Sequence, residues 1–495
     1  MTQTVERFEL APGLRVSRAI TGLWQIADME RDGRTLDVEK TAAAMSPYVA
    51  AGLTTFDMAD HYGSAELVAG AHRALHNKDV QLLTKWVPTP GRVSKADARA
   101  AVERALTRLQ SDTIDLLQFH AWNYADASWL ETLFHLQELK QEGLIGHLGL
   151  TNVDAVHLHM VLASGIKVVS NQVSFSLLDQ RAAHALAPLC LAERVHLLAY
   201  GTIAGGWLTE RWVNQPEPDW ERSATWSQMK YGRFIRAAGG WDALQRVLAA
   251  ASRVASRHQT SIANVASRFI MNQPAVAAVI IGARLGEREH IADTQRLFAL
   301  SLTPDDHAEI QAALVTLQSI PGDCGDEYRK PPFLTASGDL SHHLRTMPAP
   351  YDVVLTNGGR TACLSGTVWE RVAGFARAVR HGRRISVSGT TATLGNRVIG
   401  GRDPAAQTHF AIDKIDGALR SLGARLDDVV RTRVFVRNID DWEPVARAHG
   451  ARFGDIKPAN TLVAATLVGD DYLVEIEADA ELGEDVNDRN EREPQ

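Results

Sequence analysis

The sequence has few cysteines and no long apolar run. Its 495 residues include three cysteines, Cys190, Cys324 and Cys363, without CxxC spacing, which excludes a disulfide framework and fits a reducing compartment. No apolar run approaches the roughly 18 residues that a transmembrane helix needs. The segment Met1–Leu10 lacks the apolar core of a signal peptide. We therefore expect a cytoplasmic protein that does not enter a membrane.

Basic runs and nucleotide-binding loops are also missing. The 52 lysines and arginines are outnumbered by 59 acidic residues, which gives a net charge of −7. Nucleic acid is therefore not an expected partner. No GxGxxG follows a strand and no Walker loop occurs, so a Rossmann or P-loop nucleotide site is not supported.

The length indicates two domains, because a full (β/α)8 barrel takes only about 250–300 residues. Proline and glycine accumulate after residue 320, as in Pro321–Gly325. We expect a barrel over residues 1–320 and a linker or barrel C-terminal loop over 321–350. A smaller α+β domain is expected over 351–481, followed by a disordered acidic tail over 482–495.

Strand and helix patterns alternate through the first 300 residues, which favours parallel βαβ units. Amphipathic helices such as Ala96–Leu109 lie between short apolar strands. The count of strand ends predicts the α/β class and a (β/α)8 TIM barrel. The expected strand ends are Leu23–Gln25, Asp57, Lys85, His120, Gly149–Asn152, Val169–Phe175, Leu197–Tyr200 and Val279–Gly282.

Four polar residues stand at or just after successive strand ends: Asp57, Tyr62, Lys85 and His120. In a (β/α)8 barrel the carboxyl ends of the strands are where catalytic groups collect. Each residue also has a structural interpretation, as a loop-capping aspartate, a packed tyrosine, an exposed lysine or a core histidine. Their common register favours a shared site.

The stretch from Gly52 to Glu66, with Lys85 and His120, resembles the signature of the aldo-keto reductase superfamily. The resemblance implies hydride transfer between a nicotinamide and a carbonyl, with these four residues as a catalytic tetrad. Tyr62 would donate the proton, and the Lys85 ammonium would lower its phenol pKa from about 10. Asp57 would hold Lys85, and His120 would orient the carbonyl. No metal is required.

The resemblance also implies a nicotinamide cofactor across the barrel mouth. The matching residues are Thr151, Asn152 and Gln172 at the carboxamide, Tyr200 under the ring, and Gly282, Arg284 and His290 at the phosphate end. Arg284 would meet an adenosine 2'-phosphate, so NADP is expected, with NAD possible. Turn capping is the alternative for Thr151, Asn152 and Gln172.

The substrate is expected to be a small-molecule carbonyl or alcohol: an aldehyde, a ketone or a sugar lactol. Trp24, Trp86 and Trp122 follow strand ends, and we expect them to wall the pocket or to pack at its rim. The tryptophan-rich segment 205–240 predicts an ordered lid. Residues 328–343 are expected either to complete the pocket or to form a plain linker.

The second domain is predicted as an α+β sheet with two helices and one face in need of a partner. The expected strands are Trp369–Val379, Arg384–Gly389, Val429–Val436, Thr461–Val468 and Tyr472–Ala480, with helices over Pro404–Ser421 and Asp441–Phe453.

Motifs such as Pro458–Val463 and Val474–Ala478 resemble the YjgF/RidA (Rid) family. This implies a Rid-like (chorismate-mutase-like) fold and a homotrimer with sites between subunits. Asn460 stands where the family's imine-hydrolysing members have a carboxylate-binding arginine, and an amide cannot replace guanidinium; Glu475 matches the acidic residue of the last strand. We expect a trimerising domain with a degenerate pocket. Alternatives are an imine- or enamine-handling enzyme and a metabolite-binding regulator of the barrel.

Overall fold

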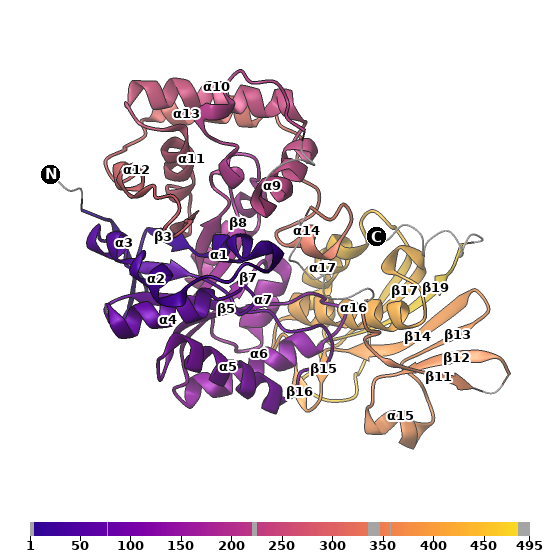
Figure 1. The fold of residues 1–495 in the computed structure, drawn as a ribbon. Helices are drawn as coiled ribbons and strands as arrows, with labels where there is room; N and C mark the ends of the chain where they lie inside the picture. Colours follow the sequence, from indigo (N-terminus) through magenta and orange to yellow (C-terminus); the bar gives the residue numbers. More distant parts are fainter. Residues whose placement is uncertain (1–3, 77, 220–224, 335–346, 357, 484–495) are drawn as a thin grey trace.

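The protein is described by a computed structural model that covers residues 4–76, 78–219, 225–334, 347–356 and 358–483. Figure 1 shows a barrel, coloured indigo to magenta, beside a smaller orange and yellow domain. Each part is built around an apolar core. Across the covered ranges, no helix has the length and apolar character needed to cross a bilayer. The expected acidic tail falls largely on residues 484–495, outside these ranges.

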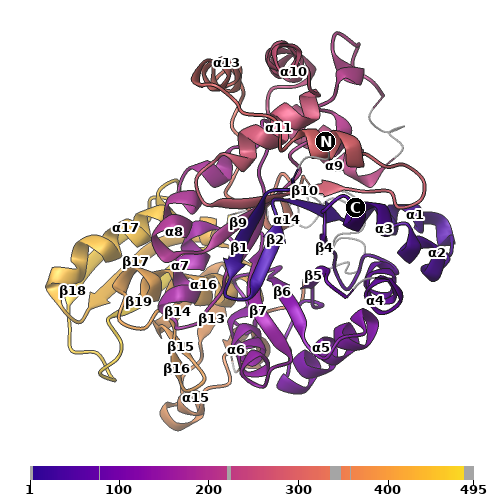
Figure 2. The ribbon, with the colours of Figure 1, turned by 90° about the vertical axis from the view of Figure 1, so that its left-hand side faces the viewer.

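The first part is a closed parallel barrel of eight strands, which confirms the predicted (β/α)8 fold. Short runs rich in Ile, Leu, Val and Phe form its strands, most of whose residues are buried on both faces. The antiparallel hairpin β1 (Arg7–Ala11) and β2 (Leu14–Ser17) lies across the strands in Figure 2. The barrel strands are β3 (Ala19–Gly22), β4 (Thr55–Asp57), β5 (Gln81–Trp86), β6 (Ile114–His120), β7 (Ile145–Thr151), β8 (Ser170–Ser174), β9 (His196–Tyr200) and β10 (Val276–Gly282).

Helices surround the barrel, and several of them begin at a capping residue. Ser94 and Asp97 form a reciprocal capping box at one helix start, and Thr303 and Asp306 form another. The surrounding helices are α2 (Val38–Ala43), α3 (Ser46–Ala50), α4 (Ala65–Leu75), α5 (Lys95–Leu109), α6 (Ser128–Gln141), α7 (Ala155–Ala163), α8 (Leu186–Glu193), α10 (Trp241–Arg257), α11 (Ile262–Met271) and α13 (Pro304–Leu314).

Four short elements bring residues to the carboxyl ends of the strands: α1 (Trp24–Met29), α9 (Trp226–Ala237), α12 (Ile291–Arg296) and α14 (Asp326–Arg329). Helix α9 belongs to the segment that we expected to be an ordered lid, and Thr225 caps its start. Trp220 of that segment lies outside the described residues. Tyr328, on α14, reaches the barrel mouth, whereas residues 335–346 are not described.

The second part is a mixed sheet with the strand order β11-β12-β13-β14-β19-β17-β18. Helices α16 (Pro404–Ser421) and α17 (Trp442–Phe453) cover one face of the sheet, and their buried residues join its core. The strands are β11 (Asp352–Thr356), β12 (Arg360–Leu364), β13 (Ala378–His381), β14 (Arg384–Thr391), β17 (Val429–Val436), β18 (Ala459–Ala464) and β19 (Val474–Glu481). A two-strand hairpin, β15 (Thr393–Leu394) and β16 (Arg397–Val398), extends toward α6.

One strand prediction in this domain is wrong. Residues 369–379 were expected to be a strand, but they contain the helix α15 (Val368–Ala373) and only the start of β13. The helix ends at Gly374, whose φ of 71° is readily adopted only by glycine. Apolar side chains of α15 are exposed, so their β-forming character did not indicate a buried strand. The hairpin β11–β12 was not predicted.

The two parts pack together through α16 and α7, which lie side by side in both views. His157 of α7 lies between Asp154 Oδ1, 2.7 Å from its Nδ1, and Asp413 Oδ2 of α16, 3.2 Å from its Nε2. His159 and Asp403 form a second pair across this junction, at 2.7 Å. At Gly417 a Cβ atom would lie 2.3 Å from the Ala125 carbonyl oxygen, so this close approach requires glycine.

Candidate active site

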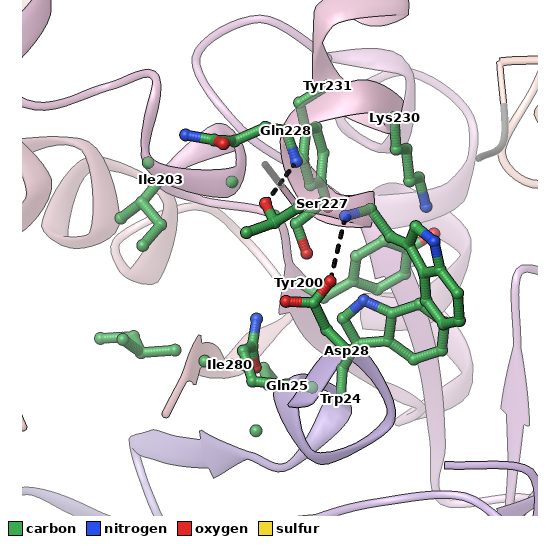
Figure 3. Close-up of a pocket in the computed structure, with 18 of the residues that line it drawn as sticks. Trp24, Gln25, Asp28, Tyr200, Ile203, Ser227, Gln228, Lys230, Tyr231 and Ile280 are labelled. Carbon is green, nitrogen blue, oxygen red and sulfur yellow. Dashed lines mark hydrogen bonds between the residues drawn. The ribbon is translucent and has the colours of Figure 1, made fainter. Parts of the chain in front are cut away.

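A cavity of about 670 Å³ opens at the carboxyl ends of the barrel strands. Strand ends, α1, α9, α14 and the loop after β10 line it. In Figure 3, Trp24, Gln25 and Asp28 enter the cavity from α1, while Lys230 and Tyr231 enter from α9. The sequence-predicted residues on its wall are Trp24, Asp57, Tyr62, Lys85, His120, Trp122, Thr151, Asn152, Gln172, Tyr200, Gly282, Arg284 and His290.

A buried ion pair forms the floor of this cavity. Lys85 Nζ lies 2.6 Å from Asp57 Oδ2 and donates a second hydrogen bond, at 2.8 Å, to the Met58 carbonyl oxygen. Asp57 Oδ1 accepts from the side-chain amides of Gln118 and Gln172, at 3.0 and 2.7 Å. Burial lowers the pKa of Lys85, an effect that Asp57 partly offsets. Asp57 therefore fixes the lysine and two neighbouring amides in one network.

Tyr62 lies beside this pair, with its ring centroid 5.1 Å from Lys85 Nζ. Burial, followed by the Asp57 carboxylate, raises the pKa of Tyr62 well above its usual value. The expected net lowering of this pKa is therefore wrong, because burial disfavours the phenolate and the Asp57 carboxylate adds to that effect. Tyr62 is a neutral, protonated phenol at physiological pH.

His120 is buried and lines the same cavity, and its Nε2 atom has no hydrogen-bond partner among the described residues. Burial and the positive charges of Arg329, His61 and Lys230 hold the His120 pKa well below its usual value. The imidazole is neutral, with one ring nitrogen available to a ligand oxygen. Its ring packs edge-on against Trp122, at 4.5 Å, and Tyr328, at 5.2 Å.

The residues expected at the carboxamide lie next to each other: Thr151 ends β7, Asn152 follows it, and Gln172 lies within β8 in register with Thr151. The buried hydroxyl of Thr151 has no hydrogen-bond partner within the described chain. Asn152 has φ of 56°, and its Oδ1 accepts from the Tyr200 hydroxyl at 2.8 Å. A buried, unsatisfied hydroxyl beside two amides is suited to a ligand amide. These residues therefore fit a nicotinamide carboxamide.

The opposite end of the cavity carries Gly282, Arg284 and His290. Arg284 is already paired, with NH1 2.6 Å from Asp28 Oδ2 and Nε 3.0 Å from Glu287 Oε2. The sequence suggested a guanidinium free to bind a phosphate. In the structure the Arg284 guanidinium is instead already bound to two carboxylates. Arg288, which the sequence analysis did not select, lines the same end.

Two of the three expected tryptophans line the cavity. Trp24 packs edge-on against Tyr62 at 4.8 Å, and the Trp122 Nε1 donates to the Pro88 carbonyl oxygen at 3.0 Å. Trp86 is absent from the cavity wall and instead packs against Phe119, because its side chain leaves β5 toward the helices. Sequence reasoning missed Lys230, Asp28 and Gln118; the last had one signal, a polar residue inside an apolar strand.

Comparison with known proteins agrees with this geometry. Residues 19–315 match the family described as the Aldo/keto reductase family. The chain belongs to the aldo/keto reductase family. Its barrel is an NAD(P)-dependent oxidoreductase. Protein tas of Escherichia coli is 28% identical over 317 residues, which cover 55% of this chain and 89% of that protein. The glycerol dehydrogenase AKR11B4 of Gluconobacter oxydans, at 21% identity, shares the fold with a TM-score of 0.51 over 65% of this chain and 98% of that one.

Residues 368–482 match a second family, described as Endoribonuclease L-PSP, and form the YjgF-like domain. The uncharacterized protein SCO2049 of Streptomyces coelicolor is 38% identical over 120 residues, which cover 24% of this chain and 90% of that protein. The aldo/keto reductase barrel is therefore joined to a domain that resembles a complete small protein.

The two residues expected in the Rid-like site are not brought together within the chain. Asn460 pairs in register with Thr432, whereas Glu475 pairs with Phe435, three positions along β17. Side chains alternate between the faces of a sheet, so the two point to opposite faces. The Asn460 amide donates to Thr432 Oγ1 at 3.0 Å in a groove of about 320 Å³ beside α17. In the described residues no cluster of metal-binding side chains occurs in either domain.

Proposed function

We propose that the barrel is a carbonyl reductase that uses NADP, with NAD as the alternative, and acts on an aldehyde, ketone or sugar lactol. One observation carries the proposal. The protonated Tyr62 phenol, the Lys85–Asp57 pair and the unpartnered His120 Nε2 all line one cavity. A bound nicotinamide supplies the hydride.

In this proposal Tyr62 gives its proton to the substrate oxygen as negative charge develops there. The Lys85 ammonium, held by Asp57, stabilises the resulting phenolate by its charge. His120 hydrogen-bonds the same oxygen through Nε2 and orients the carbonyl. Trp24 and Trp122 exclude water from the reacting centre. Thr151, Asn152 and Gln172 hold the carboxamide, and the Tyr200 ring packs on the nicotinamide.

Cofactor choice depends on the end of the cavity near Gly282 and His290. Arg284 and Arg288 favour a 2'-phosphate, while the Asp28 carboxylate favours the free ribose hydroxyls of NAD. Affinities of NADPH and NADH for the wild-type protein and for Arg284→Ala separate the two. Weaker NADPH binding in the variant, with NADH unchanged, supports NADP; equal losses contradict it.

We also propose that the Rid-like domain assembles the protein into a homotrimer. One face of its sheet is covered by α16 and α17. The other carries Arg433, ion-paired with Glu477 and Asp479, and the exposed Val463. Strand β18 has no neighbour on its outer edge within the described ranges, and such edges seek partners. The mass in solution tests this, and a monomer contradicts it.

The activity is tested by following NADPH and NADH oxidation against aldehydes, ketones and sugars, with alcohol oxidation run in parallel. Turnover that disappears in Tyr62→Phe while cofactor binding persists supports the proposal. Equal turnover by the two proteins contradicts it.

We also propose a cytoplasmic location. The three buried, unpaired cysteines fit a reducing compartment.

A further inference from the structure

Lys230 extends from α9 into the cavity and ends within a group of phenol rings. Its Nζ donates to the Tyr328 hydroxyl at 2.8 Å. The same nitrogen lies 4.8 Å from the ring centroid of Tyr200, 4.9 Å from that of Tyr328 and 5.6 Å from that of Tyr231. Figure 3 shows Lys230 and Tyr231 descending from α9 on the side of the cavity where Tyr200 lies. The aliphatic part of the side chain is thus fixed, with the ammonium facing the cavity.

This ammonium lies at the tetrad end of the cavity. Tyr328 connects it to His120, since the rings of Tyr328 and His120 are 5.2 Å apart. The charge of Lys230 also contributes to the lowered pKa of His120. The Arg284 end of the cavity is formed by different elements, α1 and the loop after β10. Lys230 is therefore placed to contact a second group of a substrate whose carbonyl lies at His120.

Two cations near the tetrad, Lys230 and Arg329, have no carboxylate within ion-pair distance among the described residues, but the Arg329 guanidinium is occupied by hydrogen bonds to the carbonyl oxygens of Ala121 and Asn152. Lys85 has Asp57, at 2.6 Å. Arg181 has Asp179, at 2.8 Å, and Glu327, at 2.9 Å. No carboxylate lies within ion-pair distance of Lys230 anywhere in the described chain, although Glu327 is near enough to act on its charge.

Lys230 remains charged despite this position. Burial alone would lower the pKa of Lys230, but Tyr328, Tyr231 and Glu327 outweigh burial and raise it. Lys230 is half-buried, and a partly desolvated ammonium without a carboxylate is stabilised when an anion approaches it. Three phenol faces stabilise it only in part, by cation–π contact of about 0.5–2 kcal/mol.

We propose that Lys230 and the Tyr328 hydroxyl form an anion subsite, so that the barrel's substrate is a carbonyl compound carrying a carboxylate or phosphate group. This inference rests on the proposed reductase function. The anion binds at Lys230 while the carbonyl lies at Tyr62 and His120. The subsite sets substrate class and orientation, and takes no part in the hydride step.

The test uses matched pairs of substrates with the full-length, cofactor-loaded protein. Aldehydes with a terminal carboxylate and three to six carbons are compared with their methyl esters, and glyceraldehyde 3-phosphate is compared with glyceraldehyde. We expect kcat/KM to favour the charged member by about 10- to 100-fold, as for a charged hydrogen bond. A preference only for the carboxylate aldehydes over their esters identifies the anionic group as a carboxylate. A preference only for glyceraldehyde 3-phosphate over glyceraldehyde identifies it as a phosphate.

Three variants assign the preference to Lys230. Lys230→Met should bring the ratio of kcat/KM for the charged over the uncharged member of each pair close to one, and Lys230→Arg should retain most of the preference, because the charge is kept. Lys167→Met is the matched control, since it removes one exposed charge far from the cavity. A preference that survives in Lys230→Met, or a wild-type protein that prefers the charged member in none of the pairs, overturns the inference.

Binding measurements separate this inference from the reductase proposal. Glutarate and methyl phosphate are titrated by calorimetry into cofactor-loaded wild-type and Lys230→Met protein. Anion binding lost in the variant, without turnover of any carbonyl compound, supports the subsite and contradicts the reductase. Turnover of esters and acids alike, with no anion binding, supports the reductase and contradicts the subsite.

Discussion

The barrel cavity and the groove of the Rid-like domain differ in how their polar groups are satisfied. In the barrel, His120 Nε2 and the Thr151 hydroxyl are buried without partners in the described structure. In the groove, Asn460 donates to Thr432, whose hydroxyl also contacts His449 Nε2 at 2.9 Å. Buried groups left unsatisfied are suited to a ligand. The comparison assigns chemistry to the barrel and leaves assembly or ligand binding for the smaller domain.

The largest effect is expected for Tyr62→Phe. Removing the phenol proton should lower kcat by about 10²- to 10⁴-fold, the usual contribution of a general acid, with cofactor affinity unchanged. Steady-state turnover and fluorescence titration of the cofactor measure the two quantities. Turnover near the wild-type value would show that Tyr62 is not the proton donor. It would also contradict the assignment of the chemistry to the barrel cavity.

Next is Lys85→Met, which leaves the buried Asp57 without its cation. We expect about 10²-fold lower turnover and a loss of about 3–5 kcal/mol in unfolding free energy. The double variant Asp57→Asn/Lys85→Met should regain part of the stability but none of the activity. Recovery of activity in the double variant would contradict the role of the ammonium.

A smaller effect on stability is expected at the domain junction. Burial alone would lower the His157 pKa, but Asp154 and Asp413 raise it. Its stabilising contribution is therefore complete below about pH 6.5 and is lost as pH rises through the higher folded pKa. Asp413 also pairs with Arg452, at 2.7 Å, and its pKa is lowered, so its contribution is lost only in acid.

Asp413→Asn should reduce stability by about 1–3 kcal/mol and weaken the loss of stability above pH 6.5. Melting temperatures from pH 5 to 9, with Asp403→Asn as a partner variant at the same junction, measure this. An unchanged pH profile would show that His157 does not titrate with unfolding.

The smallest effect is expected in the groove. Asn460→Ala removes one hydrogen bond to Thr432 and should cost about 1 kcal/mol or less, with reductase turnover within about twofold of wild type. Glu475→Gln, on the opposite face of the sheet, should likewise leave reductase turnover within about twofold of wild type. A large loss of turnover from Asn460→Ala alone would show that the groove takes part in the barrel's reaction. It would contradict the separation of roles between the two domains.

Much of the barrel could be predicted because its site residues stand in chain order at strand ends. Asp57 and His120 end their strands and Lys85 is the last residue but one of β5, so the parallel sheet brings them together. Lys230 lacks such a signal. It lies in a helix within a long segment, and its place beside Tyr328 depends on how that segment and α14 fold back over the barrel mouth.

The errors came from register and pairing, which one sequence does not reveal. Strand β18 covers Ala459–Ala464 rather than the expected 461–468, and the faces of Asn460 and Glu475 follow from how it pairs. Trp86 is the last residue of β5 and follows Lys85, and adjacent residues on a strand point to opposite sides. Only one of the two can face the cavity.

The most direct test of the account is the transfer of deuterium from C4-deuterated nicotinamide to the carbonyl carbon of a reduced substrate. The full-length protein is compared with Tyr62→Phe and Asn460→Ala. The account predicts deuterium in the product alcohol for wild type and Asn460→Ala, and almost none for Tyr62→Phe. Label transfer that persists in Tyr62→Phe and disappears in Asn460→Ala would contradict it.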